Sequence, residues 1–164
     1  MVTRWITSIK PRWMNSIATL FFLLSMGVLF VAACQRGNPS IEVDSPQAII
    51  SPIIVGSGSV FLNIVNSGRG SDVLIGARIN ISGTVTELHD MGDGKMKKVN
   101  RIIIPSSGTV RLRPAGQHVM VYRMPKKIKS GAVLSMTLSF EKSGEKSISV
   151  PVVDKYERSL GEQH

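Results

Sequence analysis

Histidine and methionine gather in one part of the sequence. The chain contains three histidines and eight methionines, and His89 and His118 lie in a segment that also holds four of the methionines. These four are Met91, Met96, Met120 and Met124. Thioether and imidazole groups together select a soft metal ion of low charge, whereas carboxylates suit hard ions. The residue types therefore predict a Cu(I) site built from methionine and histidine.

The spacing of the second group places its side chains on one face of a strand. Residues i and i+2 of an extended chain point the same way, so His118 and Met120 share a face. The same alternation would extend that face to Met124, while the intervening valines would face a core. A single methionine in a strand usually packs in the core, which is the alternative for Met124. Met124, and Met91 two residues after His89, are therefore further candidate ligands.

The remaining chain supplies strands that would position these side chains. Short runs rich in Val, Ile, Leu and Thr alternate with Gly, Ser, Asn and Pro, and no segment has a convincing amphipathic helical period. Val110 and Leu112 alternate with Arg111 and Arg113, as in a half-buried strand. The pattern predicts a single all-β domain, a sandwich or a barrel. The candidate strands are 48–55, 60–66, 71–77, 83–89, 98–104, 109–113, 118–123, 133–140 and 147–153.

The N-terminal residues are typical of an export signal. Three basic residues precede an apolar run that ends in Val31-Ala32-Ala33-Cys34, which resembles the bacterial lipobox. We expect residues 1–33 to be a lipoprotein signal peptide and Cys34 to carry the lipid. A polar tether over 34–45 would then lead to the domain over 46–154, with a polar tail over 155–164. The alternative is an uncleaved membrane anchor, since the run approaches the length of about 17 residues that spans a bilayer.

Both alternatives place the rest of the chain outside the cytoplasm. We expect it on a bacterial membrane, in the periplasm or on the outer face of the cytoplasmic membrane. Residues 34–164 carry 17 Lys and Arg against 11 Asp and Glu, a net charge of +6. Both tryptophans precede Cys34, so no basic and aromatic platform for nucleic acid remains, and we expect no such partner.

The cysteine count and the missing motifs restrict the chemistry further. Cys34 is the only cysteine, which leaves no thiol for a disulfide, a zinc–thiolate cluster or a blue-copper centre. The sequence has no Gly-x-Ser-x-Gly elbow, no His-Glu-x-x-His and no phosphate loop. We therefore expect no enzyme, and no catalytic residues.

The spacing of the candidate ligands resembles the PCu(A)C family of periplasmic copper chaperones. That family's pattern is a histidine, a spacer, a methionine, 21 residues and then His-x-Met, and 21 residues separate Met96 from His118 here. The first spacer, between His89 and Met96, is shorter than the family's by about four residues, and Gly92 and Gly94 would allow a tight turn. The stretches 59–68, 87–89, 104–108 and 138–141 also resemble the family.

The resemblance implies a fold, a ligand set and a partner. The fold would be a cupredoxin-like Greek-key β-sandwich, and the Cu(I) ligands would be His89, Met96, His118 and Met120. A monomer would pass copper to a membrane acceptor, a cytochrome c oxidase subunit or one of its assembly factors. The alternative function is a structural or assembly lipoprotein with the same fold and no working metal site.

Overall fold

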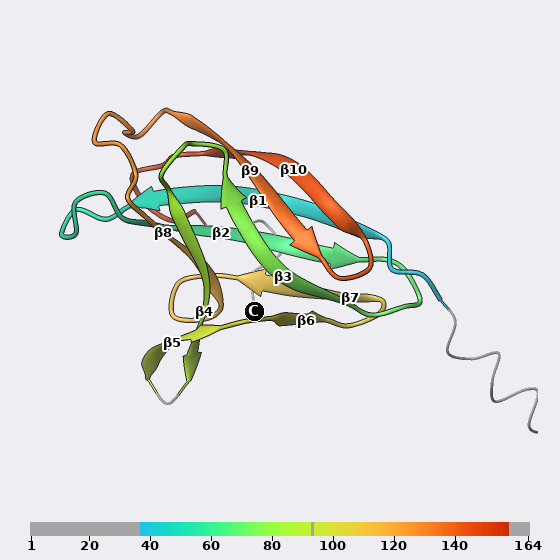
Figure 1. The fold of residues 1–164 in the computed structure, drawn as a ribbon. Coiled ribbons are helices and arrows are strands. Elements are labelled where there is room, and N and C mark those ends of the chain that lie inside the picture. Colours follow the sequence, from blue (N-terminus) through green and yellow to red (C-terminus); the bar gives the residue numbers. More distant parts are fainter. Residues whose placement is uncertain (1–36, 93, 158–164) are drawn as a thin grey trace, which may run out of the picture. The chain divides into compact units, whose positions relative to one another are not determined.

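The computed structural model describes residues 37–92 and 94–157, which form ten strands and no helix (Figure 1). The expected signal peptide and the lipidated Cys34 lie outside the described residues. Within the described part of the chain, no helix is long and apolar enough to span a bilayer. The strands are β1 (Ile41–Ile50), β2 (Gly58–Asn66), β3 (Asp72–Ile79), β4 (Val85–Gly92), β5 (Lys95–Val99), β6 (Ile102–Ile104), β7 (Gly108–Leu112), β8 (His118–Tyr122), β9 (Val133–Phe140) and β10 (Gly144–Pro151).

The strands form two antiparallel sheets that pack face to face. One sheet has six strands in the order β1-β2-β8-β4-β5, with β7 also paired to β2, and the other has four in the order β10-β9-β3-β6. Consecutive strands such as β3 and β4 lie in different sheets, so the chain crosses between the layers. The predicted all-β, cupredoxin-like Greek-key sandwich is confirmed.

The alternation of apolar residues explains the packing between the sheets. In β2, Val60, Leu62 and Ile64 are fully buried and face the second sheet, which supplies Leu74 and Met136 to the same core. Each such side chain contributes about 1.5–3 kcal/mol when it is removed from water. The residues between them in each strand point to the outer faces, as predicted for Arg111 in β7.

The shortened spacer noted in the sequence forms a tight hairpin between β4 and β5. Pairing continues to Gly92↔Lys95, and Gly94 has φ +70°, a conformation that suits glycine. The predicted strand 98–104 is in fact two strands, because β5 pairs with β4 in the six-stranded sheet and β6 pairs with β3 in the other. Residues 100 and 101 carry the chain from one sheet to the other.

Both ends of the domain extend beyond the predicted limits. The expected tether over 34–45 is too long, because β1 begins at Ile41 and pairs with Asn66. The expected polar tail begins too early, because Tyr156 packs edge-on against Phe61, with ring centroids 5.3 Å apart. The Glu157 amide also donates to Gln47 Oε1 at 2.8 Å. Residues 158–164 lie outside the described residues.

Candidate metal centre

His89 of β4 and His118 of β8 are directly opposite each other on the outer face of the six-stranded sheet. Their ring centroids are 5.8 Å apart and their planes are inclined at 42°. The residues beside them, Leu88 and Val119, form the neighbouring pair and point into the core. Although they lie on an outer face, His89 is only 7% exposed and His118 only 4%. The register of two strands thus brings together two buried imidazoles that are far apart in the sequence.

The hydrogen bond of His118 fixes which of its nitrogens is free. His118 Nδ1 lies 2.8 Å from the carbonyl oxygen of Gly116, which can only accept. Nδ1 therefore carries the hydrogen, and the Nε2 of the neutral ring has an available lone pair. A carbonyl that holds one nitrogen in this way is the usual outer partner of a metal-binding histidine.

His89 is held in the same manner by a carboxylate. Its Nε2 lies 3.1 Å from Glu87 Oε2, and Lys98 Nζ donates to Glu87 Oε1 at 2.6 Å. The hydrogen bonds from Lys98 and then from His89 lower the pKa of Glu87, which therefore stays an acceptor. His89 Nδ1 is buried and has no hydrogen-bond partner among the described residues. A buried nitrogen lone pair without a partner is costly unless a ligand completes it.

Met120 adds a thioether beside the two imidazoles. It follows His118 by two residues in β8 and is paired with Glu87 of β4, so it lies on the same face. On its other side the hydroxyl of Ser59 in β2 donates to Met120 Sδ at 3.2 Å. The side chain is half-buried. Met120 is therefore positioned between β2 and β4, next to His118.

Met91 and Met96 are paired with each other across the β4–β5 hairpin. Met91 follows His89 by two residues, so both methionines share the face of the two imidazoles. Met91 is half-buried, whereas Met96 is 51% exposed. The predicted group of His89, Met96, His118 and Met120 thus lies on one face, and Met91 lies with it.

Met124 does not lie on this face, which corrects the expected alternation. β8 ends at Tyr122, and Arg123 has φ +58°, a left-handed conformation that reverses the direction of the next side chain. Met124 is buried in the hydrophobic core, and its methyl group packs over Gly58. The same core contains Met136 of β9.

Several residues around the site were missed by the sequence analysis. Phe61 of β2 has its ring centroid 6.2 Å from that of His118 and is covered in turn by Tyr156. Glu87 could have been found, because it precedes His89 by two residues and so shares its face. Ser59 and Tyr156 give no signal in the sequence, since their positions depend on strand pairing and on the path of the C-terminal segment.

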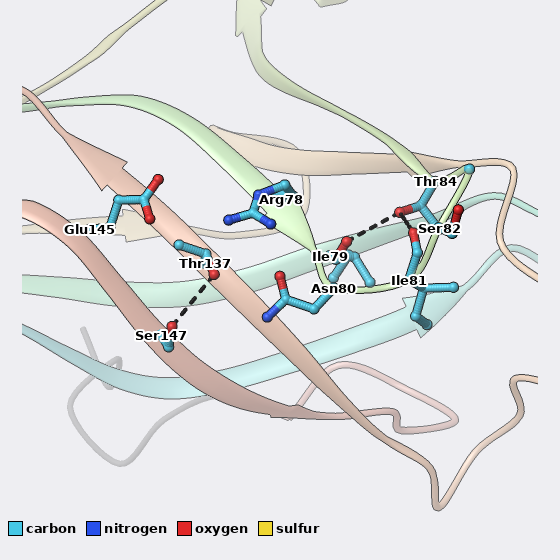
Figure 2. A pocket seen from close by; sticks show the side chains of 10 residues that line it. Arg78, Ile79, Asn80, Ile81, Ser82, Thr84, Thr137, Glu145 and Ser147 are labelled. Carbon is cyan, nitrogen blue, oxygen red and sulfur yellow. Dashed lines mark hydrogen bonds between the residues drawn. The ribbon is translucent and has the colours of Figure 1, made fainter.

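A separate open hollow lies over the outer face of the four-stranded sheet and lacks these residue types. Its lining includes Arg78, Asn80, Thr84 and Glu145 but no histidine or methionine (Figure 2). Thr84 Oγ1 donates to the Ile81 carbonyl at 2.7 Å, so its hydroxyl is satisfied within the turn. Within residues 37–92 and 94–157 no three His, Cys, Asp or Glu side chains are gathered for a metal. The imidazole and thioether group is therefore the stronger candidate for metal chemistry.

The donor atoms of this group fit a soft ion. Two nitrogen lone pairs are available, each on a ring whose other nitrogen is held by an acceptor. Thioethers stand beside them, and the nearest carboxylate, Glu87, is occupied by Lys98 and His89. Soft sulfur and imidazole ligands of this kind suit monovalent copper better than calcium or magnesium.

The fold and site together define a cupredoxin-like β-sandwich of the PCu(A)C type, with histidine and methionine on one sheet face. The chain belongs to the family described as "Putative lipoprotein LpqE-like", whose model matches residues 41–152. A relative from Leifsonia xyli subsp. xyli, "Putative lipoprotein Lxx21020", is 26% identical over 143 residues, which cover 84% of this chain and 86% of the relative.

Solved structures with the same fold include the copper-bound PCuAC domain from PmoF2. It is 25% identical, with a TM-score of 0.61 over 70% of this chain and 93% of that domain. The apo PCuAC domain from PmoF1 has a TM-score of 0.62 at 24% identity over 70% and 94% of the two chains. The solution structure of CuI-DR1885 from Deinococcus radiodurans has a TM-score of 0.58 at 21% identity over 70% and 80%. The predicted resemblance to PCu(A)C domains is thereby confirmed.

Proposed function

We propose that this protein is an extracytoplasmic copper chaperone that carries Cu(I) on His89, His118, Met120 and Met96. The observation that carries the proposal is the pair of opposed imidazoles, each with one nitrogen held and the other available. The orphaned Nδ1 of His89 would gain a partner when the ion binds. The PmoF2 domain that shares the fold is described as copper-bound, which supports the choice of ion.

The arrangement suits a carrier because its ligands differ in exposure. The two imidazoles are buried, whereas Met96 on the hairpin is half exposed and Met91 lies opposite it. An acceptor's ligands would therefore replace the hairpin thioether first and the imidazoles later. Such stepwise exchange moves Cu(I) down an affinity gradient without releasing it to water. Met91 is a further candidate ligand, while the core position of Met124 gives it no part in this proposal.

The proposal includes a lipid anchor at Cys34 and a membrane acceptor. Membership of a family of lipoproteins supports the anchor, and the lipobox-like residues before Cys34 specify its position. The resemblance to PCu(A)C chaperones suggests the copper centre of cytochrome c oxidase as the acceptor. Deleting this chain should then lower oxidase activity when copper is limiting. Normal oxidase assembly in the deletion strain under those conditions would refute delivery and leave copper binding intact.

An anaerobic titration tests the binding proposal. Residues 35–164 compete with a chromophoric Cu(I) chelator, beside the variants His118→Ala/Met120→Ala and Met124→Leu. We expect one tightly bound Cu(I) in the parent and in Met124→Leu, because that methionine packs in the core. The double variant should lose at least about 100-fold in affinity, since it removes two ligands. Equal, weak binding by all three proteins would instead favour a structural lipoprotein without a working metal site.

A further inference from the structure

The loop between β1 and β2 presents three consecutive large apolar side chains to solvent. Ile53 is 88% exposed, Ile54 60% and Val55 73%, and Pro52 before them is also exposed. Isolated apolar residues on a surface are ordinary, but a contiguous group at a protruding loop marks an interaction site. This loop lies at one end of the sandwich (Figure 1).

Hydrogen bonds hold the loop in this shape. Ser51 Oγ accepts from the amides of Ile53 and Ile54 at 3.3 and 3.0 Å, and the Ser57 amide and hydroxyl both donate to the Ile54 carbonyl. The Ser51 amide donates to the Ser57 carbonyl at 2.9 Å and closes the base of the loop. The apolar side chains are therefore fixed outward by a satisfied backbone, which lowers the entropy lost when they are buried by a partner.

A basic segment lies directly beside this loop. The Met124 amide donates to the Gly56 carbonyl at 2.8 Å, which joins the β8–β9 connection to the loop. That connection carries four exposed cations and no acidic residue, and residues 51–57 contain no acidic residue either. The four cations are Arg123, Lys126, Lys127 and Lys129. An apolar tip beside a segment whose charged residues are all cations is complementary to a bilayer with anionic headgroups.

We infer that loop 51–57 and segment 123–129 form a membrane-docking surface, in which the apolar tip enters an anionic bilayer and the cations contact its headgroups. β2 runs from this loop straight to Ser59, which is paired with Met120. Docking would therefore fix the orientation of the imidazole and thioether face relative to the membrane. A lipid on Cys34 would by itself limit only the distance between the domain and the membrane. The inference does not depend on copper, so it stands or fails separately from the proposed function.

Vesicle binding by unlipidated residues 35–164 tests the inference, since both sheets lie entirely within residues 41–151. We expect co-sedimentation with equimolar phosphatidylcholine and phosphatidylglycerol, and much less with phosphatidylcholine alone. Ile53→Ser/Ile54→Ser/Val55→Ser should lower the partition coefficient at least about tenfold. Lys126→Gln/Lys127→Gln should lower it roughly fivefold for each cation removed. The matched control Arg101→Gln/Arg111→Gln, at exposed sites elsewhere, should bind as the parent does.

A fluorescent reporter locates the contact itself. Residues 35–164 contain no tryptophan, so Ile54→Trp introduces a single probe, and Ile103→Trp provides an exposed control on β6. We expect the emission of Ile54→Trp to shift to the blue and to be quenched by brominated lipids, and that of Ile103→Trp to stay unchanged. No vesicle binding by the parent would overturn the inference. So would unchanged binding of the serine variant, or loop-dependent self-association without lipid, which would assign the surface to a second copy of the chain.

Discussion

His89 and His118 are predicted to respond differently when each is replaced by leucine in the metal-free protein. Removing His89 also removes a buried nitrogen without a partner, and such a group costs about 1–3 kcal/mol. The lost contact with Glu87 matters little, because that carboxylate is partly exposed and keeps Lys98. His89→Leu should therefore be neutral or up to about 1 kcal/mol more stable. His118→Leu should be less stable by about 1 kcal/mol, because the Gly116 carbonyl loses its donor.

Adding Cu(I) should reverse the order of the parent and His89→Leu. At free Cu(I) about 100 times its dissociation constant, the parent gains about 2.7 kcal/mol. If the loss of one ligand weakens binding about 100-fold, the variant gains only about 0.4 kcal/mol under the same conditions. Urea denaturation with a Cu(I) chelator, and then with buffered Cu(I), measures both states. A metal-free His89→Leu that is more than about 2 kcal/mol less stable than the parent would refute the reasoning, since His89 Nδ1 would then be satisfied without metal.

Three further predictions concern residues around the site and at the ends of the sheets. Glu87→Gln should weaken Cu(I) binding about 10- to 100-fold in the chelator competition, because the carboxylate that orients His89 is lost; unchanged affinity would remove it from the site. Asn66→Ala should lower the free energy of unfolding by about 3–4 kcal/mol, because its amide makes four hydrogen bonds that join three loops, and exposed Asn100→Ala is the control. The pKa of Asp72 lies below its ordinary value of 3.8, because hydrogen bonds from Ser143, Lys142 and Val73 outweigh the opposing effect of burial. The stability that Asp72 adds is therefore complete above that value and is lost as the pH falls through the lowered pKa, so the difference from Asp72→Asn in denaturation should shrink below about pH 4.

The faces of the strands could be predicted from sequence because side-chain direction follows a period of two. His118 and Met120 share one face of β8, and in β7 Val110 and Leu112 lie on the face opposite Arg111, as alternation requires. The same rule failed at Met124, where the left-handed backbone of Arg123 breaks the period. The sequence gives no sign of this break in alternation, because arginine rarely adopts a left-handed conformation.

The pairing of strands could not be predicted, because it depends on contacts between distant segments. Asn100 and Arg101 interrupt the candidate strand over 98–104, but nothing in the sequence assigns its two halves to different sheets. The opposition of His89 and His118, which creates the candidate site, is likewise a matter of register. Tyr156 lies in a polar segment, and its contact with Phe61 arises only from the fold.

X-ray absorption at the copper K-edge of the Cu(I)-loaded domain identifies the atoms that bind the ion. We predict a three- or four-coordinate Cu(I) that is bound by both imidazole nitrogen and thioether sulfur. In His89→Leu the nitrogen contribution should fall, while in Met120→Leu the sulfur contribution should fall. A first shell of nitrogen and oxygen alone, unchanged in both variants, would contradict binding of copper by the histidine and methionine face of the six-stranded sheet.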